Sequence, residues 1–483
     1  MGRLATSALC AFIATVFAGC ATNPVTGEQN LVLVSERQEL ALGQQAHQQT
    51  LQQYRVYEDA ALQQYVDAVG QRLAAVSHRD DLNFTFTLLD SAEINAFALP
   101  GGYIYITRGL LAYLNSEAEL AAVLGHEIGH VTARHGVRQA SSAQATNLGA
   151  GLLSIFLPGL RSTGMQQSLG LLSTAVLRGY GREHELEADR LGVEYLSASG
   201  YDRHAMFRVV RTLKNHQLLD NRIAAAEGRE VRAYHGVFST HPDHDTRLKS
   251  VVAYDGSSDH DGTDERRRFL DQIDGLIFGM NPAEGLFLDD RFVHRDLGFS
   301  LRMPADWRGQ NLSDQVVMTD PGQQAILMLR LAPHEGQALD VALRRFGVGA
   351  LSRREALTIN GLPALAGLAQ VSVQGQQRPA RIIGVQLGQY VYAFLGVTRD
   401  ADALGGFDAQ FRRAAQSFRA LTPDERASIP TRKVKVTRLK SAISWATLGQ
   451  ASPLKLFAAD HLKVLNASTT ADAATGTRIK IIE

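Results

Sequence analysis

Residues 126–130 read His126-Glu127-Ile128-Gly129-His130, and this stretch decides how the rest of the chain is interpreted. A Ser-X-X-Glu capping pattern at 116–119 predicts a helix that extends over the stretch to about residue 136. Histidines four residues apart lie on one face of a helix, so both imidazoles can reach one ion. Glu127 lies beside them, where a carboxylate can accept a proton from a metal-activated water. The stretch therefore predicts a metal centre with Glu127 as its general base.

Glycines precede and interrupt the motif at Gly125 and Gly129. Each costs about 1 kcal/mol in a helix relative to alanine, which asks for a physical reason. We expect the missing side chains to leave room for a ligand at the helix surface. The alternative interpretation is a helix with two surface histidines, but the apolar residues on both sides of the motif disfavour it.

A third metal ligand is expected from residues 182–189, which open another predicted helix. Glu185 and Asp189 are one turn apart, so Glu185 can bind the ion while Asp189 accepts a hydrogen bond from a ligand histidine. Two histidines and one carboxylate favour zinc among the available metals and leave its fourth position open for water. Spacing alone leaves three other ligands open, namely Glu183, Glu187 and His184.

Taken together, the motifs resemble the zinc metallopeptidase family of the CAAX prenyl endopeptidases and HtpX-type proteases, a gluzincin group with HExxH and ExxxD motifs. The resemblance covers roughly residues 24–250. No membrane-spanning stretch follows Gly19, so the chain is similar to the soluble periplasmic, BepA-like branch. Four pieces carry the resemblance, in the family's order: residues 95–102 (Asn-Ala-Phe-Ala-Leu-Pro-Gly-Gly), 126–130, 185–189 (Glu-Leu-Glu-Ala-Asp), and 239–242 (Ser-Thr-His-Pro) with Arg247.

The resemblance implies a role for each matching residue. One zinc ion per chain would be held by His126, His130 and Glu185, with Glu127 as general base and Asp189 orienting a histidine ligand. His241 would act as an oxyanion donor or a removable extra ligand, supported by Arg247. Substrate would bind as an extended strand along Gly102–Ile106, with contacts from Asn95, Ala96, Gly102 and Tyr103. The neighbouring His135 and His184 are expected to be surface residues.

The N-terminus reads as a targeting segment. A single charge at Arg3, an apolar run over 8–17 and small residues before Cys20 predict a signal peptide over 1–19. The Ala-Gly-Cys ending resembles a bacterial lipobox, which implies lipid attachment to Cys20 and an outer-membrane lipoprotein facing the periplasm. The alternative is a plain signal peptide and a soluble periplasmic protein.

Composition limits the class of protein. The chain has 483 residues, 45% of them hydrophobic, and 49 basic residues balance 49 acidic ones. This excludes a wholly disordered chain, and the absence of a basic excess gives no indication of a nucleic-acid partner. Two cysteines exclude a disulfide framework and a cysteine-based metal cluster.

The predicted fold is a mainly α zincin-type metallopeptidase domain with a small β-sheet over 20–255. A linker or helix over 256–289, an α+β accessory domain over 290–425 and a small LysM-like module over 432–483 follow. The module match would imply binding to peptidoglycan. The apolar stretch 147–177 is interpreted as two core helices, as a mobile lid over the cleft, or as a surface that dips into lipid.

The predicted function is that of a zinc-dependent endopeptidase in envelope protein quality control. Unfolded or misassembled outer-membrane proteins are its expected substrates, by resemblance to the family. Two alternatives remain: a zinc-bearing periplasmic chaperone or assembly factor, and a peptidoglycan-tethered scaffold.

Overall fold

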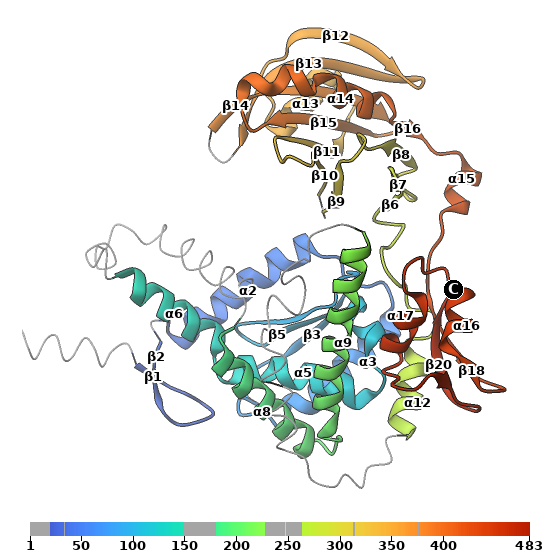
Figure 1. Ribbon diagram of the computed structural model, residues 1–483. Helices are drawn as coiled ribbons and strands as arrows, with labels where there is room; N and C mark the ends of the chain where they lie inside the picture. Colours follow the sequence, from blue (N-terminus) through green and yellow to red (C-terminus); the bar gives the residue numbers. More distant parts are fainter. Residues whose placement is uncertain are drawn as a thin grey trace, which may run out of the picture. The chain divides into compact units, whose positions relative to one another are not determined.

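The computed structural model describes residues 20–32, 34–148, 180–227, 247, 263–312, 314–373 and 376–483. The chain divides into two compact units. Unit 1 contains residues 1–279 and 432–483, and unit 2 contains residues 280–431 (Figure 1). The predicted signal peptide, nearly all of the apolar stretch 147–177, and the polar segment 255–262 lie outside the described residues.

The first part of unit 1 combines helices with a three-stranded sheet. Its elements are β1 (Cys20–Thr22), β2 (Gln29–Leu31), α2 (Glu36–Gln53), α3 (Ala60–Ala74), β3 (Thr85–Leu89), β4 (Ala96–Leu99), β5 (Tyr103–Thr107), α4 (Arg108–Tyr113), α5 (Glu117–Thr132), α6 (His135–Leu148), α8 (Arg182–Ala198), α9 (His204–Ala226) and α12 (Thr263–Gln272). The strand order in the sheet is β3-β5-β4, with β5 parallel to β3 and antiparallel to β4.

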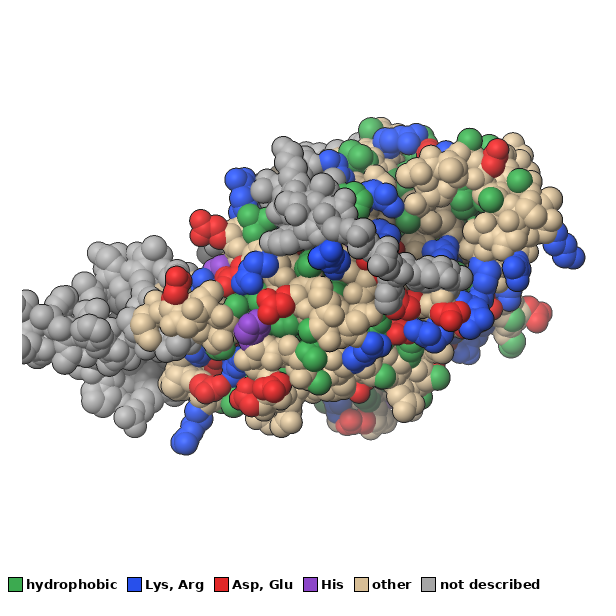
Figure 2. Space-filling model, turned by 90° about the horizontal axis from the view of Figure 1, so that it is seen from below, with side chains coloured by type: hydrophobic (Ala, Val, Ile, Leu, Met, Phe, Trp, Pro, Cys, Tyr) green, Lys and Arg blue, Asp and Glu red, His purple; other side chains and the backbone are tan. Residues whose placement is uncertain are grey.

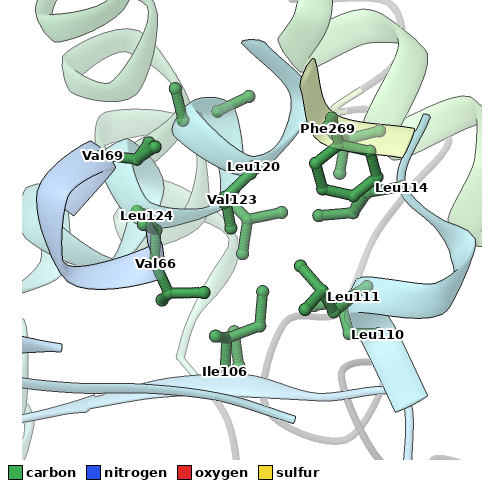
Figure 3. Packing of buried hydrophobic residues seen from close by; sticks show 14 of the residues in the cluster. Val66, Val69, Ile106, Leu110, Leu111, Leu114, Leu120, Val123, Leu124 and Phe269 are labelled. Atoms are coloured by element: carbon green, nitrogen blue, oxygen red, sulfur yellow. The ribbon is translucent and has the colours of Figure 1, made fainter. Parts of the chain in front are cut away.

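Helix α5 lies at the centre of unit 1, where it contacts α3, α8, α9 and β4 (Figure 1). All sixteen of its residues are buried, which suits a helix that is apolar on most sides. Figure 3 shows how the core forms around it: Leu120, Val123 and Leu124 of α5 point toward side chains from α3, β5, α4 and α12. The motif helix is therefore held from every side.

Two predicted helices differ from the structure. The sequence over 24–75 predicts helices, with a capping box at Ser35 and Gln38, but the segment begins as a β1–β2 hairpin before α2 and α3. The helix expected to reach about residue 136 ends at Thr132, because Arg134 adopts the left-handed region at φ 56° and α6 then starts in a new direction. The capping box predicted at Ser35 and Gln38 is present at the start of α2.

The C-terminal segment belongs to unit 1. Its elements are β17 (Val434–Arg438), β18 (Ile443–Ser444), α16 (Trp445–Gln450), α17 (Ala458–Leu465), β19 (Asp472–Ala473) and β20 (Arg478–Ile482), and β17 pairs antiparallel with β20. Trp445, Leu462 and Ile482 join the same hydrophobic core as α5. The fully buried Lys480 donates from Nζ to the carbonyl oxygens of Ala112 and Leu114, at 2.7 and 2.6 Å, and so caps the end of α4.

Unit 2 is rich in β-structure. Its elements are β6 (Leu286–Leu288), β7 (Arg291–His294), β8 (Phe299–Arg302), β9 (Arg308–Asn311), β10 (Gln315–Thr319), β11 (Ala325–Pro333), α13 (Leu339–Leu343), η2 (Arg344–Phe346), β12 (Ser352–Ile359), β13 (Leu362–Val373), β14 (Gln376–Leu387), β15 (Tyr390–Thr398), η3 (Ala401–Ala403), α14 (Leu404–Gln416), β16 (Arg419–Ala420) and α15 (Pro423–Ser428).

A seven-stranded antiparallel sheet forms the centre of unit 2, in the order β12-β13-β14-β15-β11-β10-β9. Central strand β15 is buried on both faces. Tyr392 and Phe394 pack with α14 and the smaller sheet β16-β8-β7-β6, whereas Val391 and Leu395 pack with α13. This agrees with the predicted α+β texture after residue 290.

Two further observations concern the surface and the membrane. Acidic and basic side chains are interspersed on the face drawn in Figure 2, as equal numbers of the two would suggest. Of the helices described, none is both long and apolar enough to cross a bilayer.

Candidate metal centre

Helix α5 supplies two of the candidate ligands. Its N-cap residue Ser116 accepts a hydrogen bond from the Glu119 amide, as the capping pattern predicts. One helical turn separates His126 from His130, and their Nε2 atoms lie 3.0 Å apart. Both rings are buried, so they offer their nitrogens to a common interior point and not to bulk solvent.

Helix α8 supplies the third ligand. Glu185 is fully buried, with its carboxylate oxygens 3.6 Å from the Nε2 atoms of both His126 and His130. The three ligand atoms all lie within 4.8 Å of one another. Two imidazoles and a carboxylate at this spacing form a donor set that fits a metal ion of the zinc type.

The glycines of α5 have a different purpose from the one expected. A Cβ at Gly129 would lie 3.0 Å from the carbonyl oxygen of Ala188 in α8, and one at Gly125 would lie 3.4 Å from Gly192. The missing side chains therefore allow two helix backbones to approach closely, because atoms of α8 lie where the Cβ atoms would be. This close packing carries Glu185 up to the two histidines.

Asp189 and Arg247 fix the orientation of His126. Asp189 Oδ1 lies 2.8 Å from His126 Nδ1, and Arg247 donates two hydrogen bonds to the same carboxylate, at 2.7 and 2.8 Å. Arg247 also lies 3.2 Å from Glu185. Burial acts to raise the pKa of Asp189, but the Arg247 guanidinium outweighs it and holds that pKa well below its usual range. Arg247 thus contacts Asp189 and Glu185, whereas its expected partner His241 lies outside the described residues.

His130 is held by two residues for which the sequence predicts other places, His135 at the surface and Glu187 as an alternative ligand. His135 Nδ1 lies 2.8 Å from His130 Nδ1, and His135 Nε2 lies 2.9 Å from Glu187 Oε2. The expectation that His135 is a surface residue is wrong, because it is fully buried. The signal that could have revealed it was the short spacing between His130 and His135, but the reversal at Arg134 that brings the rings together is not visible in the sequence.

The remaining acid of the motif, Glu127, is also buried. Burial raises the pKa of the Tyr180 phenol, and the negative charge of Glu127 raises it further. The ring of Tyr180 in turn stacks on His130, with centroids 4.0 Å apart. Glu127 therefore lies in the same enclosed environment as the ligands, where a carboxylate and a metal-activated water can exchange a proton.

The strand expected to bind substrate is placed differently by the structure. Strand β5, which contains Tyr103, is the central strand, and both of its edges are paired. Gly102 adopts φ 93° at the turn that enters β5. In the β4–β5 ladder, Phe97 lies opposite Tyr105, and the Thr107 amide donates to the Asn95 carbonyl oxygen. The backbone N–H and C=O groups of Asn95 and Phe97 therefore point toward β5.

The alternate residues of β4, Ala96 and Ala98, therefore direct their backbone N–H and C=O groups away from the sheet. The opposite edge, on β3, is covered: Gln63 bonds to the backbone of Phe86 and Leu88. The edge at which a further strand could pair is thus that of β4, one strand from the position predicted. Near its end, Ala98 and His130 line one small cavity.

The remaining predicted residues are His241 and Cys20. His241 lies outside the described residues. Cys20 begins strand β1, and the ladder with β2 places it opposite Leu31.

Comparisons with known proteins agree with this site. Residues 60–255 match the profile of Peptidase family M48. The Beta-barrel assembly-enhancing protease of Yersinia pestis is 32% identical over 235 residues, which are 47% of this chain and 46% of that protein. The Mitochondrial metalloendopeptidase OMA1 of Schizosaccharomyces pombe is 29% identical over 233 residues, which are 47% of this chain and 64% of that protein.

The family resemblance predicted from the motifs is confirmed by these matches. The aligned part spans less than two thirds of the length of either relative. Among solved structures, PsbP from Synechocystis sp. PCC 6803 covers 27% of this chain and 91% of its own, at 18% identity and a TM-score of 0.22.

Proposed function

From the match of residues 60–255 to Peptidase family M48, we propose that this protein is a zinc-dependent endopeptidase. The observation that carries the proposal is the buried set of His126, His130 and Glu185, whose ligand atoms converge within 4.8 Å. Such a set leaves a coordination position open in catalytic zinc sites.

The chemistry assigns a role to each residue. A zinc ion held by His126, His130 and Glu185 would polarise the scissile carbonyl and make a nearby water molecule more acidic. Glu127 accepts the proton of the attacking water and then donates it to the leaving amine. Asp189 and Arg247 hold His126 in orientation, through the contacts at 2.7–2.8 Å. His241 remains our candidate for an oxyanion donor or a removable ligand.

Substrate binding is proposed at the outer edge of β4. An extended chain that pairs with Ala96 and Ala98 would be read mainly through its backbone, so unfolded segments are preferred over particular side chains. The relative from Yersinia pestis is named for β-barrel assembly. We therefore propose unfolded or misassembled outer-membrane proteins as substrates, with Cys20 as a lipid anchor that holds the enzyme on the periplasmic face of the outer membrane.

The decisive experiment compares the mature chain with its Glu127→Gln and Glu183→Gln variants, all loaded with zinc, on a urea-unfolded outer-membrane protein. Glu183 is an exposed acid in the first turn of α8 and is the matched control. We expect wild type and Glu183→Gln to cleave the substrate. Glu127→Gln should bind zinc as wild type does, but its cleavage rate should be lower by about 100-fold or more.

Two results would contradict the proposal. Cleavage by Glu127→Gln at the wild-type rate would remove Glu127 from its role. A wild-type chain that holds zinc, cleaves nothing and still suppresses aggregation of the unfolded protein would identify the zinc-bearing chaperone instead.

A further inference from the structure

The two candidate ligand histidines of α5 are supported in different ways. His126 contacts a carboxylate directly, since Asp189 lies 2.8 Å from its Nδ1. His130 contacts another imidazole, that of His135, at the same distance. On the His130 side, the carboxylate is one side chain further away: Glu187 Oε2 lies 2.9 Å from His135 Nε2.

The positions of the protons follow from this geometry. His130 offers Nε2 to the metal, because this atom faces His126 at 3.0 Å and Glu185 at 3.6 Å. A metal-binding nitrogen carries no proton, so the proton of neutral His130 is at Nδ1 and is donated to His135 Nδ1. His135 must then carry its own proton at Nε2, which donates to Glu187. Each hydrogen bond in this series therefore fixes the position of the next proton.

The surroundings hold this chain of hydrogen bonds in place. His135 is fully buried, and its ring stacks on His184 with centroids 4.3 Å apart. Arg138 donates to the same Glu187 oxygen at 3.0 Å. Glu187 thus accepts from both His135 and Arg138, and these two bonds fix its carboxylate at the end of the series.

The turn before His135 is held by a buried ion pair. Arg134, in the left-handed conformation, donates from Nε to Glu39 Oε2 at 2.8 Å. Glu39 comes from α2, and its carboxylate is buried. A residue other than glycine pays a conformational cost in this region, so the pair with Glu39 stabilises a reversal that would otherwise be disfavoured. That reversal is what returns the chain toward His130.

We propose that His135 and Glu187 are positioning residues for the metal ligand His130, fixing its tautomer and ring orientation through the bonds Nδ1–H to Nδ1 and Nε2–H to Oε2. The inference rests on the proposed function, since it assumes that His130 is a ligand. It adds that the two histidines depend on separate supports, Asp189 for His126 and the His135–Glu187 pair for His130. Neither support replaces the other.

The test measures zinc affinity and not only cleavage. The full mature chain and three variants, His135→Phe, Glu187→Leu and Glu187→Gln, are titrated with zinc against a competing chelator. Phe keeps a flat ring for the stack on His184 but cannot accept a hydrogen bond, whereas Gln keeps an acceptor at Glu187. The matched control is His184→Phe, which keeps a flat ring against His135 and Tyr180.

We expect His135→Phe and Glu187→Leu to bind zinc about 10- to 100-fold more weakly, as for other residues that orient metal-bound histidines. Glu187→Gln should recover most of the loss, and His184→Phe should match wild type. The visible absorption of the Co²⁺-loaded chain should shift in His135→Phe, because a reoriented His130 alters the ligand field, and a purely structural role would leave it unchanged.

The outcomes separate this inference from the proposed function. If His135→Phe does not fold, Glu187→Leu and Glu187→Gln decide, because the Glu187 side chain is 17% exposed and lies outside the core. Wild-type affinity and an unchanged Co²⁺ spectrum in the folded variants would overturn the positioning role while wild type still binds zinc and cleaves. A wild-type chain that binds no zinc would overturn the proposed function, and this inference with it.

Discussion

Arg247 is the buried cation that the carboxylates of the metal centre share. It bonds to Asp189 and lies 3.2 Å from Glu185. Burial acts to lower the pKa of its guanidinium, but the charges of Asp189, Glu185 and Glu127 outweigh it and raise that pKa. Removing the guanidinium would leave buried negative charge without compensation, which is among the costliest changes a protein interior can undergo.

Arg247→Met is therefore expected to lower the free energy of unfolding of unit 1 by about 3–5 kcal/mol in the metal-free protein. The control is Arg190→Met, whose pair with Glu194 at 3.5 Å is largely exposed and should contribute no more than about 0.5 kcal/mol. Urea unfolding can be followed in a Trp307→Phe background, where Trp445 is the remaining tryptophan. Equal losses in the two variants would contradict the shared-cation interpretation.

At the scale of single residues, the sequence reveals those that lie one helical turn apart. The one-turn intervals from His126 to His130 and from Glu185 to Asp189 could be recognised without a structure. The spacing could not choose among Glu183, Glu185 and Glu187, because that choice depends on how α8 packs on α5. Nor could it find His135, whose position depends on the left-handed Arg134.

Among the elements, edge strand β4 is the one whose outward-facing backbone groups matter for the proposed function. Ala98→Pro removes one outward N–H, which a strand edge tolerates, while Ala98→Val keeps it and adds similar bulk. We expect Ala98→Pro to lower kcat/KM for an extended peptide by up to about tenfold, through the loss of one hydrogen bond, with zinc affinity unchanged. An equal loss in Ala98→Val would indicate a packing effect and argue against strand addition.

Local sequence signals locate several elements but not their neighbours. The alternation at 84–89 and the β-rich residues at 103–107, after Pro100-Gly101-Gly102, predict two strands, and β3 and β5 lie there. Gly200, at φ 72°, predicts the end of α8 and follows it. Which strand of the sheet is central depends on pairings between separate segments, and no residue in β5 signals it. The strand predicted to pair with substrate, β5, is therefore the central one, and the edge strand beside it is β4.

For the whole molecule, the main finding is that unit 2 interrupts unit 1. The amide of Phe278 donates to Arg432 O at 2.8 Å, and Ile277 forms a bridge with Lys433, so the chain leaves and re-enters unit 1 at adjacent points. The sequence showed the change in texture after residue 290, but nothing in it indicated that residues 432–483 return to the first core. Such long-range packing has no local pattern.

This connectivity predicts opposite results for two deletions. A chain that ends at residue 431 lacks Trp445, Leu462 and Ile482 from its core and should lose cooperative unfolding and zinc binding. A chain in which a short glycine-serine linker joins Gly279 to Arg432 should keep both, as judged by thermal melting and zinc titration. If the first deletion left unit 1 intact, residues 432–483 would be a separable module, and its proposed glycan binding could then be tested by deletion.

Acid should destabilise the contact between the C-terminal segment and α4. Burial lowers the pKa of His216 and of His461 from 6.5 to about 4. The unfolded chain therefore binds these protons near pH 6.5 and the folded chain only near pH 4, so stability is complete above pH 6.5 and falls as the pH drops toward 4. His216→Phe should flatten this fall in urea unfolding followed by Trp445. Parallel curves for wild type and variant would contradict it.

The position of Ile482 in the core also sets when that core can close during synthesis. Domains generally fold from the N-terminus as the chain emerges, yet the core around α5 lacks its last side chains until β20 has been made. Helix α5 is complete about 350 residues earlier, counting from Thr132 to Ile482. A nascent chain that has not yet reached β20 would therefore carry the candidate metal ligands without a finished scaffold.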